Sequence, residues 1–499
     1  MINPIEKIVI KTYNATAALF SGREKRTPKQ DELLVGQAAH PYQPRKQENV
    51  FLSILARVLH LYILGASGSG KSTLLYYLII QDILAGRGFC LIDPHGDLYH
   101  QILSYIAGPY LQGKTPAERQ QIAKKLVLID PSCRAWVTGF NPLEAVGVDP
   151  YAQSMDFVGF LKKLWADAHW GPRMAELIRN SLVTLSINRL TLLEVRPLLT
   201  DPLFRERLVA NLPEGETIEY WLYRYNTLSE RMQATYREPI LNRLSVFLSD
   251  PSLRLMVGVK ESTINFRQIM DQGHWMLVNL SKGHLKNNAS LLGGFAIAKL
   301  QLCALSRVDV PQDRRTPFFV YVDEFQNFVG EDFETILSEA RKYGLGLTLA
   351  HQNLDQIDRT LRSSILGNTL TQVIFRTSNQ DAAILAAEIG QSDKTIIQRK
   401  LINLQQRQAF FKKKGEPARL MTTPFVSPVK VSHEDVQLLI ELSMSHHARP
   451  RNEVEQEIRN RSSHAREEER GFLQLNLKND PDDNQFAPEE QYKEEFKEW

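Results

Sequence analysis

Cysteine is scarce in this sequence, with three residues in 499. Cys90, Cys133 and Cys303 lie far apart and have no partner at the spacing of a metal-binding motif. Their scarcity argues against a disulfide-stabilised fold, and their spacing argues against a zinc site. Such a chain is typical of a reducing compartment, so we expect a cytoplasmic protein.

Long apolar runs are also missing. The first twenty residues lack the basic start, apolar centre and small-residue cleavage site of a secretory signal. The most apolar stretch, SLLGGFAIAKLQLCAL, contains Lys299 and falls short of the ~18 uninterrupted apolar residues of a membrane helix. We expect it to be a buried helix, and we expect no intrinsic membrane span.

A strong charge of either sign is absent as well. The net charge is +3 at pH 7, with 43% apolar and 23% charged residues. These values are ordinary for a soluble globular protein. They neither require nor exclude nucleic acid as a partner, because phosphate binding depends on local clusters of charge.

Two separate parts of the chain show the pattern of a parallel sheet. Short β-rich apolar runs alternate with helical stretches over residues 51–144 and again over 258–430. Residues 145–257 instead repeat apolar residues at helical spacing, which predicts an all-α inserted domain. We expect residues 1–50, which are basic and contain proline, to form a surface arm, and residues 431–499 to form a helical, charged, partly disordered tail.

The strongest motif is GASGSGKST, which follows the strand-like run LYIL and precedes a helical stretch. Backbone N–H groups of such a loop wrap the phosphates of ATP, while Lys71 neutralises the β- and γ-phosphates and Ser72 ligates Mg²⁺. The alternative is a glycine-rich turn that binds no nucleotide. The predicted nucleotide-binding residues are Gly65, Ala66, Ser67, Gly68, Ser69, Gly70, Lys71, Ser72 and Thr73.

A second motif, FFVYVDEFQNF, supplies carboxylates at the end of a predicted buried strand. Asp323 is a candidate Mg²⁺ ligand, and Glu324 is a candidate for polarising the attacking water. A helix cap would explain the pair equally well if it stood alone, but the phosphate-binding loop upstream favours catalysis. The two motifs together predict an α/β fold with a RecA-like P-loop core and a mostly parallel central sheet.

Two further residues are candidates for catalysis. Gln352 follows the strand-like run LGLTLA, where an amide can contact the γ-phosphate, although a solvated loop amide is the alternative. Arg341, in SEARKYG, can serve as an arginine finger for a neighbouring subunit, or can be an ordinary surface arginine.

The ordered series LYILGASGSGKST, FCLIDPHGDL, LVLIDPSCRAWVTGFNPL, VYVDEFQNF, SEARKYGLGLTLAHQNLDQI and LGNTLTQVIFRTSNQDA resembles the HerA and FtsK clade of P-loop motors. Within that clade it is most similar to conjugative coupling proteins, in a soluble form. The resemblance implies ATP and Mg²⁺ as cofactors, DNA as substrate and a homohexameric ring. It also implies the roles of Lys71, Ser72, Asp323, Glu324, Gln352 and Arg341 given above, and it draws attention to His95 and Asp97 of DPHGD, which a simple turn also explains.

The predicted helical domain contains a stretch in which aromatic and basic residues alternate. Such residues can stack on bases and hold phosphates, but the amphipathic pattern of a helix explains the same composition, and we favour the latter. The residues in question are Tyr220, Trp221, Tyr223, Tyr225, Arg224, Arg231, Arg237 and Arg243. Arg173 and Arg179 are candidates for a subunit interface or for plain solvation.

The sequence therefore predicts an ATP-driven DNA translocase for conjugation or type IV secretion. One alternative is a HerA-like ring that regulates a nuclease or other effector in phage defence, and another is a secretion ATPase that acts on protein cargo. Relaxase, secretion and effector proteins are the corresponding partners. The acidic end of the chain either contacts a partner, shields a basic channel or remains solvated.

Overall fold

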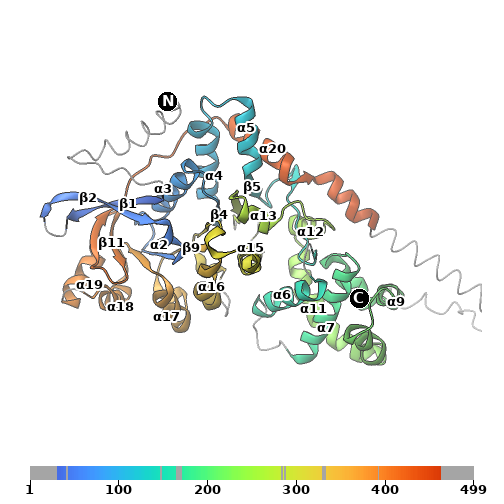
Figure 1. The fold of residues 1–499 in the computed structure, drawn as a ribbon. Coiled ribbons are helices and arrows are strands. Elements are labelled where there is room, and N and C mark those ends of the chain that lie inside the picture. The colour runs from blue at the N-terminus through green and yellow to red at the C-terminus, as the bar shows by residue number, and fades with distance from the viewer. Residues whose placement is uncertain are drawn as a thin grey trace, which may run out of the picture.

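The computed structural model describes residues 31–461, apart from 41–42, 146–148, 165–170, 282–284, 286–287, 329–332 and 391–392. A large sheet with helices on both faces forms one part of the molecule, and a group of helices forms the other (Figure 1). The fold is α/β with an all-α insertion, as predicted.

Eleven strands of the described chain form the sheet, and seven of them run parallel. Every residue of these seven strands is buried, because helices cover both faces. In spatial order they are β10 (Thr371–Ile374), β3 (Leu61–Leu64), β9 (Leu345–His351), β8 (Phe318–Val322), β4 (Phe89–Asp93), β7 (Trp275–Asn279) and β5 (Leu126–Ile129).

The two faces of the sheet have separate apolar cores, because successive side chains of a strand point to opposite faces. Leu61 and Ile63 belong to one core, and Tyr62 and Leu64 belong to the other. Helices α3 (Lys71–Leu84), α4 (Asp97–Tyr105) and α5 (Pro116–Lys125) lie on one side in Figure 1. The other side carries α15 (Asn288–Leu305), α16 (Phe333–Glu339) and α17 (Arg359–Asn368). Helices α18 (Asn379–Ile389) and α19 (Lys394–Ile402) lie near the end of the sheet that residues 32–53 form.

The prediction of a surface arm before residue 51 is wrong for its described part. Strands β1 (Glu32–His40) and β2 (Gln43–Ser53) form a hairpin that extends the sheet through β12 (Arg419–Thr422) and β11 (Gln408–Lys413). Leu33 and Val35 are fully buried, and the Gln81 side chain accepts from the Leu34 N–H (2.8 Å) and donates to its carbonyl (3.0 Å). Proline and lysine near the hairpin turn obscured two long strands in the sequence. Residues 1–30 lie outside the described part.

The insertion consists of helices whose starts are set by local residues. Asp201 and Asp250 each accept hydrogen bonds from the N–H groups of the following turn, and each is followed by proline at the first helical position. The helices are α6 (Pro150–Leu164), α7 (Pro172–Ile187), α8 (Val195–Thr200), α9 (Pro202–Val209), α10 (Glu216–Glu219), α11 (Glu230–Leu248) and α12 (Pro251–Val257). Helix α13 (Phe266–Asp271) leads back to β7.

One helical stretch of the described chain, Asn288–Asp309, is long and apolar enough to span a membrane by length and composition. The core helix of a soluble protein passes the same test. Helix α15 makes up most of this stretch and packs against α13 and α6, and its Phe295 stacks on Phe140 with ring centroids 4.8 Å apart. These contacts are those of the buried helix that we expected.

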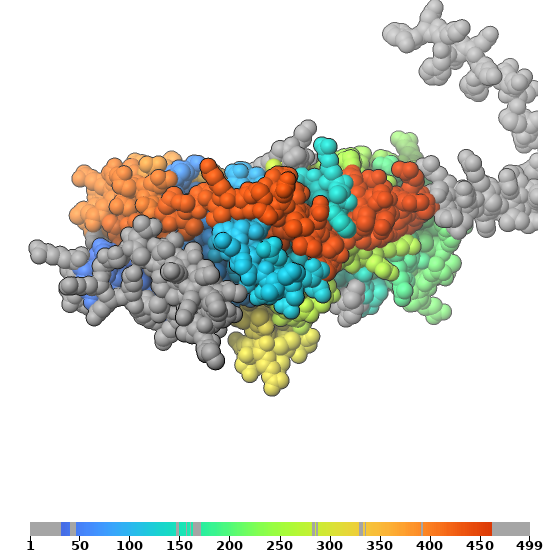
Figure 2. Space-filling view, turned by 90° about the horizontal axis from the view of Figure 1, so that it is seen from above, coloured from blue at the N-terminus to red at the C-terminus, as the bar shows by residue number. Residues whose placement is uncertain are grey.

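The chain beyond residue 431 packs on the sheet part of the molecule instead of leaving it as a tail. Helix α20 (His433–His447) lies along α5 and β5, where the buried Ser443 hydroxyl donates to the Leu126 carbonyl (2.6 Å). His446 bonds to Gln120 (2.9 Å), and His447 bonds to the Lys124 carbonyl (2.8 Å). Figure 2 shows this part of the chain, in orange and red, crossing one face of the molecule.

The same segment then reaches the helical domain. Strand β13 (Arg449–Pro450) pairs with β6 (Trp136–Val137), and residues 451–461 are helical. The Arg461 guanidinium donates to the Glu194 carboxylate (2.8 Å) and to the Gly258 carbonyl (2.6 Å). We call residues 433–461 the C-terminal segment. The predicted disorder falls on residues 462–499, which lie outside the described part.

A buried polar network fixes α3 against the sheet. Arg57, in α2 (Ile54–Val58), donates to both carboxylate oxygens of Asp82 (2.8 and 2.7 Å) and lies over the Phe319 ring. The Tyr321 hydroxyl donates to Asp82 (2.6 Å) and accepts from Arg57 (2.7 Å). The network joins α2, α3 and β8 because Asp82 lies on α3 and Tyr321 on β8.

Replacing Asp82 by asparagine should lower the free energy of unfolding by about 3–5 kcal/mol, because it leaves the buried Arg57 cation without its counter-charge. Tyr321→Phe removes one hydrogen bond and should cost about 1 kcal/mol. Glu416→Gln, which breaks the exposed ion pair with Lys413, should cost almost nothing. Chemical denaturation measures all three, and equal effects of Asp82→Asn and Glu416→Gln would contradict the assignment.

A second prediction concerns His60, whose ring is fully buried and neutral. Its Nδ1 accepts from the Leu347 N–H (3.0 Å), so Nε2 carries the proton and donates to the Leu337 carbonyl (3.0 Å). Burial lowers the pKa of His60 to about 4, and the nearby Arg341 acts in the same direction. A pKa below the unfolded value of ~6.5 gives stability that is present above pH 6.5 and is lost as pH falls towards 4.

From pH 8 to pH 5 the His60 contribution to the free energy of unfolding should fall by about 2 kcal/mol. His60→Asn has no titrating group and tolerates the left-handed backbone at this position (φ 68°), so it serves as the matched variant. The stability difference between the two proteins should therefore shrink between pH 8 and pH 5 in urea denaturation. A difference that does not change with pH would show that His60 does not titrate there.

Candidate nucleotide-hydrolysis site

The phosphate-binding loop lies between β3 and α3, at the carboxyl end of the sheet. Gly70 precedes α3 with φ 116°, a conformation that side chains disfavour. Gly65 has no room for a side chain, because a Cβ there would lie 2.5 Å from the Cβ of Phe375. The loop is also held by the Ala66 N–H, which donates to the Arg376 carbonyl (2.8 Å). The pattern of glycines therefore matches the backbone that the loop adopts.

Lys71 is buried at the start of α3 and folds back on the loop. Its Nζ donates to the carbonyls of Gly65 (2.6 Å) and Ala66 (3.3 Å). Burial lowers the pKa of Lys71, and the carboxylates of Glu324 and Asp323 oppose that shift. The side chain is thus a cation held close to the place where phosphates lie in such loops.

Ser72 and Asp323 form the second part of the site. The Ser72 hydroxyl lies 3.4 Å from Oδ2 of Asp323, which follows the buried strand β8. Burial raises the pKa of Asp323 to about 6, and the charges of Glu324 and Asp93 contribute to the shift. A hydroxyl and a carboxylate so placed are a donor pair of the kind that Mg²⁺ prefers, because it takes oxygen ligands.

Glu324 is held in an unusual backbone conformation. Its φ is 46° and ψ is 49°, in the left-handed region, at a cost of about 1–3 kcal/mol. The carboxylate accepts from Gln326 Nε2 (2.9 Å) and from Gln352 Nε2 (2.9 Å), and Asn327 donates to the Glu324 carbonyl (2.9 Å). Three amide side chains therefore hold a strained acidic residue in one position.

Gln352 reaches Glu324 because β9 lies between the phosphate-loop strand β3 and strand β8. The residue before it, His351, is buried and bonds through Nε2 to the Tyr62 hydroxyl (2.6 Å). Burial lowers the pKa of His351 to about 3, so the ring is neutral. The end of β9 is thereby fixed: the His351 carbonyl accepts from the Gly65 N–H of the loop (3.3 Å), and the Gln352 amide donates to Glu324.

Comparisons with known proteins agree with this architecture. Residues 317–427 match the family described as the TraM recognition site of TraD and TraG. The plasmid coupling protein TrwB in complex with a non-hydrolysable ATP analogue is 15% identical, with 84% of this chain and 94% of that chain covered and a TM-score of 0.55. For TrwB with ADP and Mg²⁺ the identity is 14%, the coverage 82% and 98%, and the TM-score 0.54. VirB4 of Thermoanaerobacter pseudethanolicus is 15% identical over 82% and 99%, with a TM-score of 0.51.

The chain has the P-loop fold of the conjugative coupling proteins. No curated protein sequence gives a significant match. The matched family segment contains β8, β9 and β10, and so includes Asp323, Glu324 and Gln352.

The coupling-protein fold brings Lys71, Ser72, Asp323, Glu324 and Gln352 together but places Arg341 elsewhere. Arg341 is exposed just before β9, at the amino end of the strand, whereas Gln352 follows its carboxyl end. Seven residues of strand separate the two, about 20 Å. Arg341 therefore cannot contribute to the site of its own chain.

The DPHGD segment contributes a different residue from the two named in the sequence analysis. His95 and Asp97 are exposed, whereas Asp93 is buried next to Asp323. Asp93 accepts from the backbone N–H groups of His95 (2.9 Å) and Tyr99 (2.9 Å), so it orders the turn after β4. The segment therefore combines a turn with a buried carboxylate.

Arg407 contacts the phosphate-binding loop, although no sequence motif indicated it. Its backbone N–H donates to the Ser69 carbonyl (2.8 Å), and its own φ is 68°. A Cβ on Gly70 would lie 3.4 Å from the Arg407 backbone. Its guanidinium lies over Phe425, with 5.5 Å to the ring centroid. A turn between α19 and β11 thus supports the loop from a segment far away in sequence.

The aromatic residues of the helical domain are mainly core residues. Tyr220, Trp221 and Tyr225 are buried, and the Trp221 indole donates to the Thr184 hydroxyl (2.8 Å), whereas Tyr223 is exposed. Several nearby arginines have protein partners: Arg224 with Glu176, Arg237 with Glu230, Arg173 with Tyr236 and Arg179 with Glu216. The structure supports the interpretation as helical amphipathicity.

The residues fit a bound nucleotide with Mg²⁺. The buried Ser69 hydroxyl has no hydrogen-bond partner within the described chain, although it lies in the phosphate-binding loop. Ser67 and Gly68 are exposed at the loop tip, and Thr73 is half-buried on α3. Loop N–H groups and Lys71 suit phosphates, and Ser72 with Asp323 suits the metal ion.

Gln352→Ala should lower kcat for ATP hydrolysis by about 10- to 100-fold and leave nucleotide affinity almost unchanged, because the amide holds Glu324 and not the loop. Glu324→Gln should lower kcat by about 100-fold or more. Gln398→Ala, which removes an amide bonded to Asn379 on the surface, is the matched control and should behave as wild type. Equal losses of affinity and rate in Gln352→Ala would contradict this division of roles.

Proposed function

We propose that this chain is an Mg²⁺-dependent ATPase that moves DNA, as part of a conjugative or type IV secretion apparatus. The observation that carries the proposal is the meeting of Lys71, Ser72, Asp323 and Glu324 at the carboxyl ends of β3 and β8. Ligands bind at this edge of parallel α/β sheets.

The roles of the side chains follow from their positions. Lys71 and the loop N–H groups bind the β- and γ-phosphates, and Ser72 and Asp323 hold the metal ion. Mg²⁺, when bound there, would neutralise negative charge that develops on the phosphates. The Glu324 carboxylate, oriented by Gln326 and Gln352, accepts a hydrogen bond from the attacking water and takes its proton. Because Gln352 follows β9 and donates to Glu324, a change in the position of Glu324 during the reaction would move the end of β9.

Transport of DNA is supported by the coupling-protein fold and by the family match over residues 317–427. A ring of several copies, a hexamer by analogy with the family, gives Arg341 a function, because an arginine at the opposite edge of the sheet can reach a neighbour's nucleotide. Relaxase or secretion proteins are the proposed partners, and the cytoplasm is the proposed location.

Protein cargo is the second candidate function. The burial of Tyr220, Trp221 and Tyr225 removes most of the surface that we considered for stacking on bases. The structural similarity to VirB4 is also compatible with a secretion ATPase. A protein-transport ATPase would use the same catalytic site and would be indifferent to DNA.

The steady-state ATPase rate with and without single- and double-stranded DNA tests the proposal. DNA should raise the ATPase rate severalfold. Lys71→Ala should lower the ATPase rate at least about 100-fold, because the phosphates lose their buried cation. Gln398→Ala again serves as control. Light scattering in the presence of ATP and DNA measures the mass of the assembly and so the number of copies in the ring. A rate that is robust but unaffected by either form of DNA would overturn DNA transport and favour protein cargo.

A further inference from the structure

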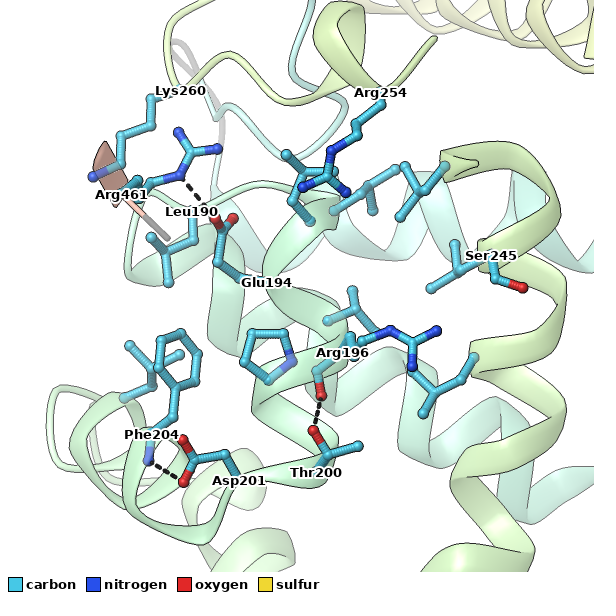
Figure 3. Close-up of a pocket in the computed structure, with 18 of the residues that line it drawn as sticks. Leu190, Glu194, Arg196, Thr200, Asp201, Phe204, Ser245, Arg254, Lys260 and Arg461 are labelled. Atoms are coloured by element: carbon cyan, nitrogen blue, oxygen red, sulfur yellow. Dashed lines mark hydrogen bonds and ion pairs between the residues drawn. The ribbon is translucent and has the colours of Figure 1, made fainter. Parts of the chain in front are cut away.

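The helical domain contains a hollow that the proposed ATPase reaction does not use. Its volume is about 1240 Å³, and its walls come from α8, α9, α11 and the end of the C-terminal segment. Figure 3 shows its lining residues, with Arg196 and Thr200 on α8 and Arg461 opposite them. It lies away from the nucleotide site, since none of Lys71, Asp323 and Glu324 lines it.

The hollow has an apolar floor and a basic rim. Buried leucines and Phe204 form the floor, namely Leu192, Leu208, Leu241 and Leu244 with that phenylalanine. Six cations and four carboxylates contribute to the lining. The cations are Arg196, Arg207, Arg254, Lys260, Arg449 and Arg461, and the carboxylates are Glu194, Asp201, Glu261 and Glu457.

Most of these carboxylates already have partners. Glu194 binds Arg461 (2.8 Å), and Glu457 binds Arg449 (2.5 Å). Asp201 accepts from backbone N–H groups at the start of α9. These three carboxylates are therefore not available as partners for the other cations of the rim.

Three exposed cations of the rim have no ion pair within the described part of the chain, namely Arg196, Arg254 and Lys260. Figure 3 shows them on separate elements around the hollow. Their like charges repel one another in the empty hollow, and an acidic occupant relieves that repulsion. The apolar floor further favours an occupant that has large apolar side chains.

The end of this chain has both properties. Residues 480–499, the acidic terminus, contain eight aspartates and glutamates against two lysines. They also contain Phe486, Tyr492, Phe496 and Trp499. The described chain ends at Arg461, which is itself part of the rim. The eighteen residues from 462 to 479 can span up to about 60 Å, so the terminus can reach the hollow.

We propose that the acidic terminus docks in this hollow of its own chain. The carboxylates of residues 480–499 neutralise Arg196, Arg254 and Lys260, and the aromatic side chains pack on the floor near Phe204. Because the terminus is tethered close to the rim, its effective concentration is in the millimolar range, and any external acidic peptide must displace it.

Zero-length carbodiimide cross-linking of the full chain tests the proposal, because Lys260 is the only lysine of the lining and the reagent joins amines to carboxylates. Peptide mass spectrometry should find Lys260 linked to carboxylates of residues 480–499. An equal mixture of ¹⁵N-labelled and unlabelled chains should give links within one chain. The yield should fall at least about fivefold in 0.5 M salt, which screens the charges.

The double variant Arg196→Gln/Arg254→Gln keeps Lys260 and should lower the yield about fivefold. Arg359→Gln/Arg399→Gln removes the same charge from exposed positions of the motor and should leave the yield unchanged. Absence of the link, equal yields in both double variants, or links only between different chains would overturn the proposal. The measurement needs no ATP hydrolysis, so its outcome is separate from that of the proposed function.

Discussion

The buried pairing of Arg57 with Asp82 determines where the phosphate-binding loop lies. Asp82 is near the end of α3, and Tyr321 of β8 shares its carboxylate. Since Lys71 begins α3 and Asp323 follows β8, this network contributes to the separation between the two parts of the candidate site. Displacing either partner would leave a charge unpaired in apolar surroundings, so the network resists movement.

The fold around the candidate nucleotide site was predictable from sequence because its signals are local. The glycines at 65 and 70 stand where backbone contacts and a positive φ demand them, and the apolar run before Asp323 is a fully buried strand. Strand order was not contained in these signals. That β9 lies between β3 and β8, and so brings Gln352 to Glu324, depends on long-range pairing that no motif encodes.

Other parts were missed for the same reason. The β1–β2 hairpin has weak strand propensity, and it is stabilised by Gln81 of α3, which lies 47 residues from Leu34. Arg407 acts through its backbone N–H on Ser69, so the identity of its side chain gave no indication of the contact. The alternation of Tyr and Arg over residues 220–243 allowed two interpretations, and the favoured one, helical amphipathicity, agrees with the burial of Trp221, whose indole N–H donates to Thr184 of α7. The hairpin and the Arg407 contact thus depend on tertiary interactions that the local sequence pattern does not indicate.

The C-terminal segment adds a second connection between the helical domain and the sheet part of the molecule. It binds β5 through Ser443 and α5 through His447, and it binds the helical domain through Arg461. The helical domain also packs directly on the sheet part of the molecule, because α6 contacts α15 and the Phe157 ring lies 5.8 Å from that of Phe295. The hollow is lined by α8 of the helical domain and by the segment, so the proposed occupant would contact both. Docking of the acidic terminus, as proposed, would therefore favour arrangements in which α8 and the segment stay together. By linkage, a displacement of the segment on α5 or β5 would change the affinity of the hollow for the terminus by the same free energy.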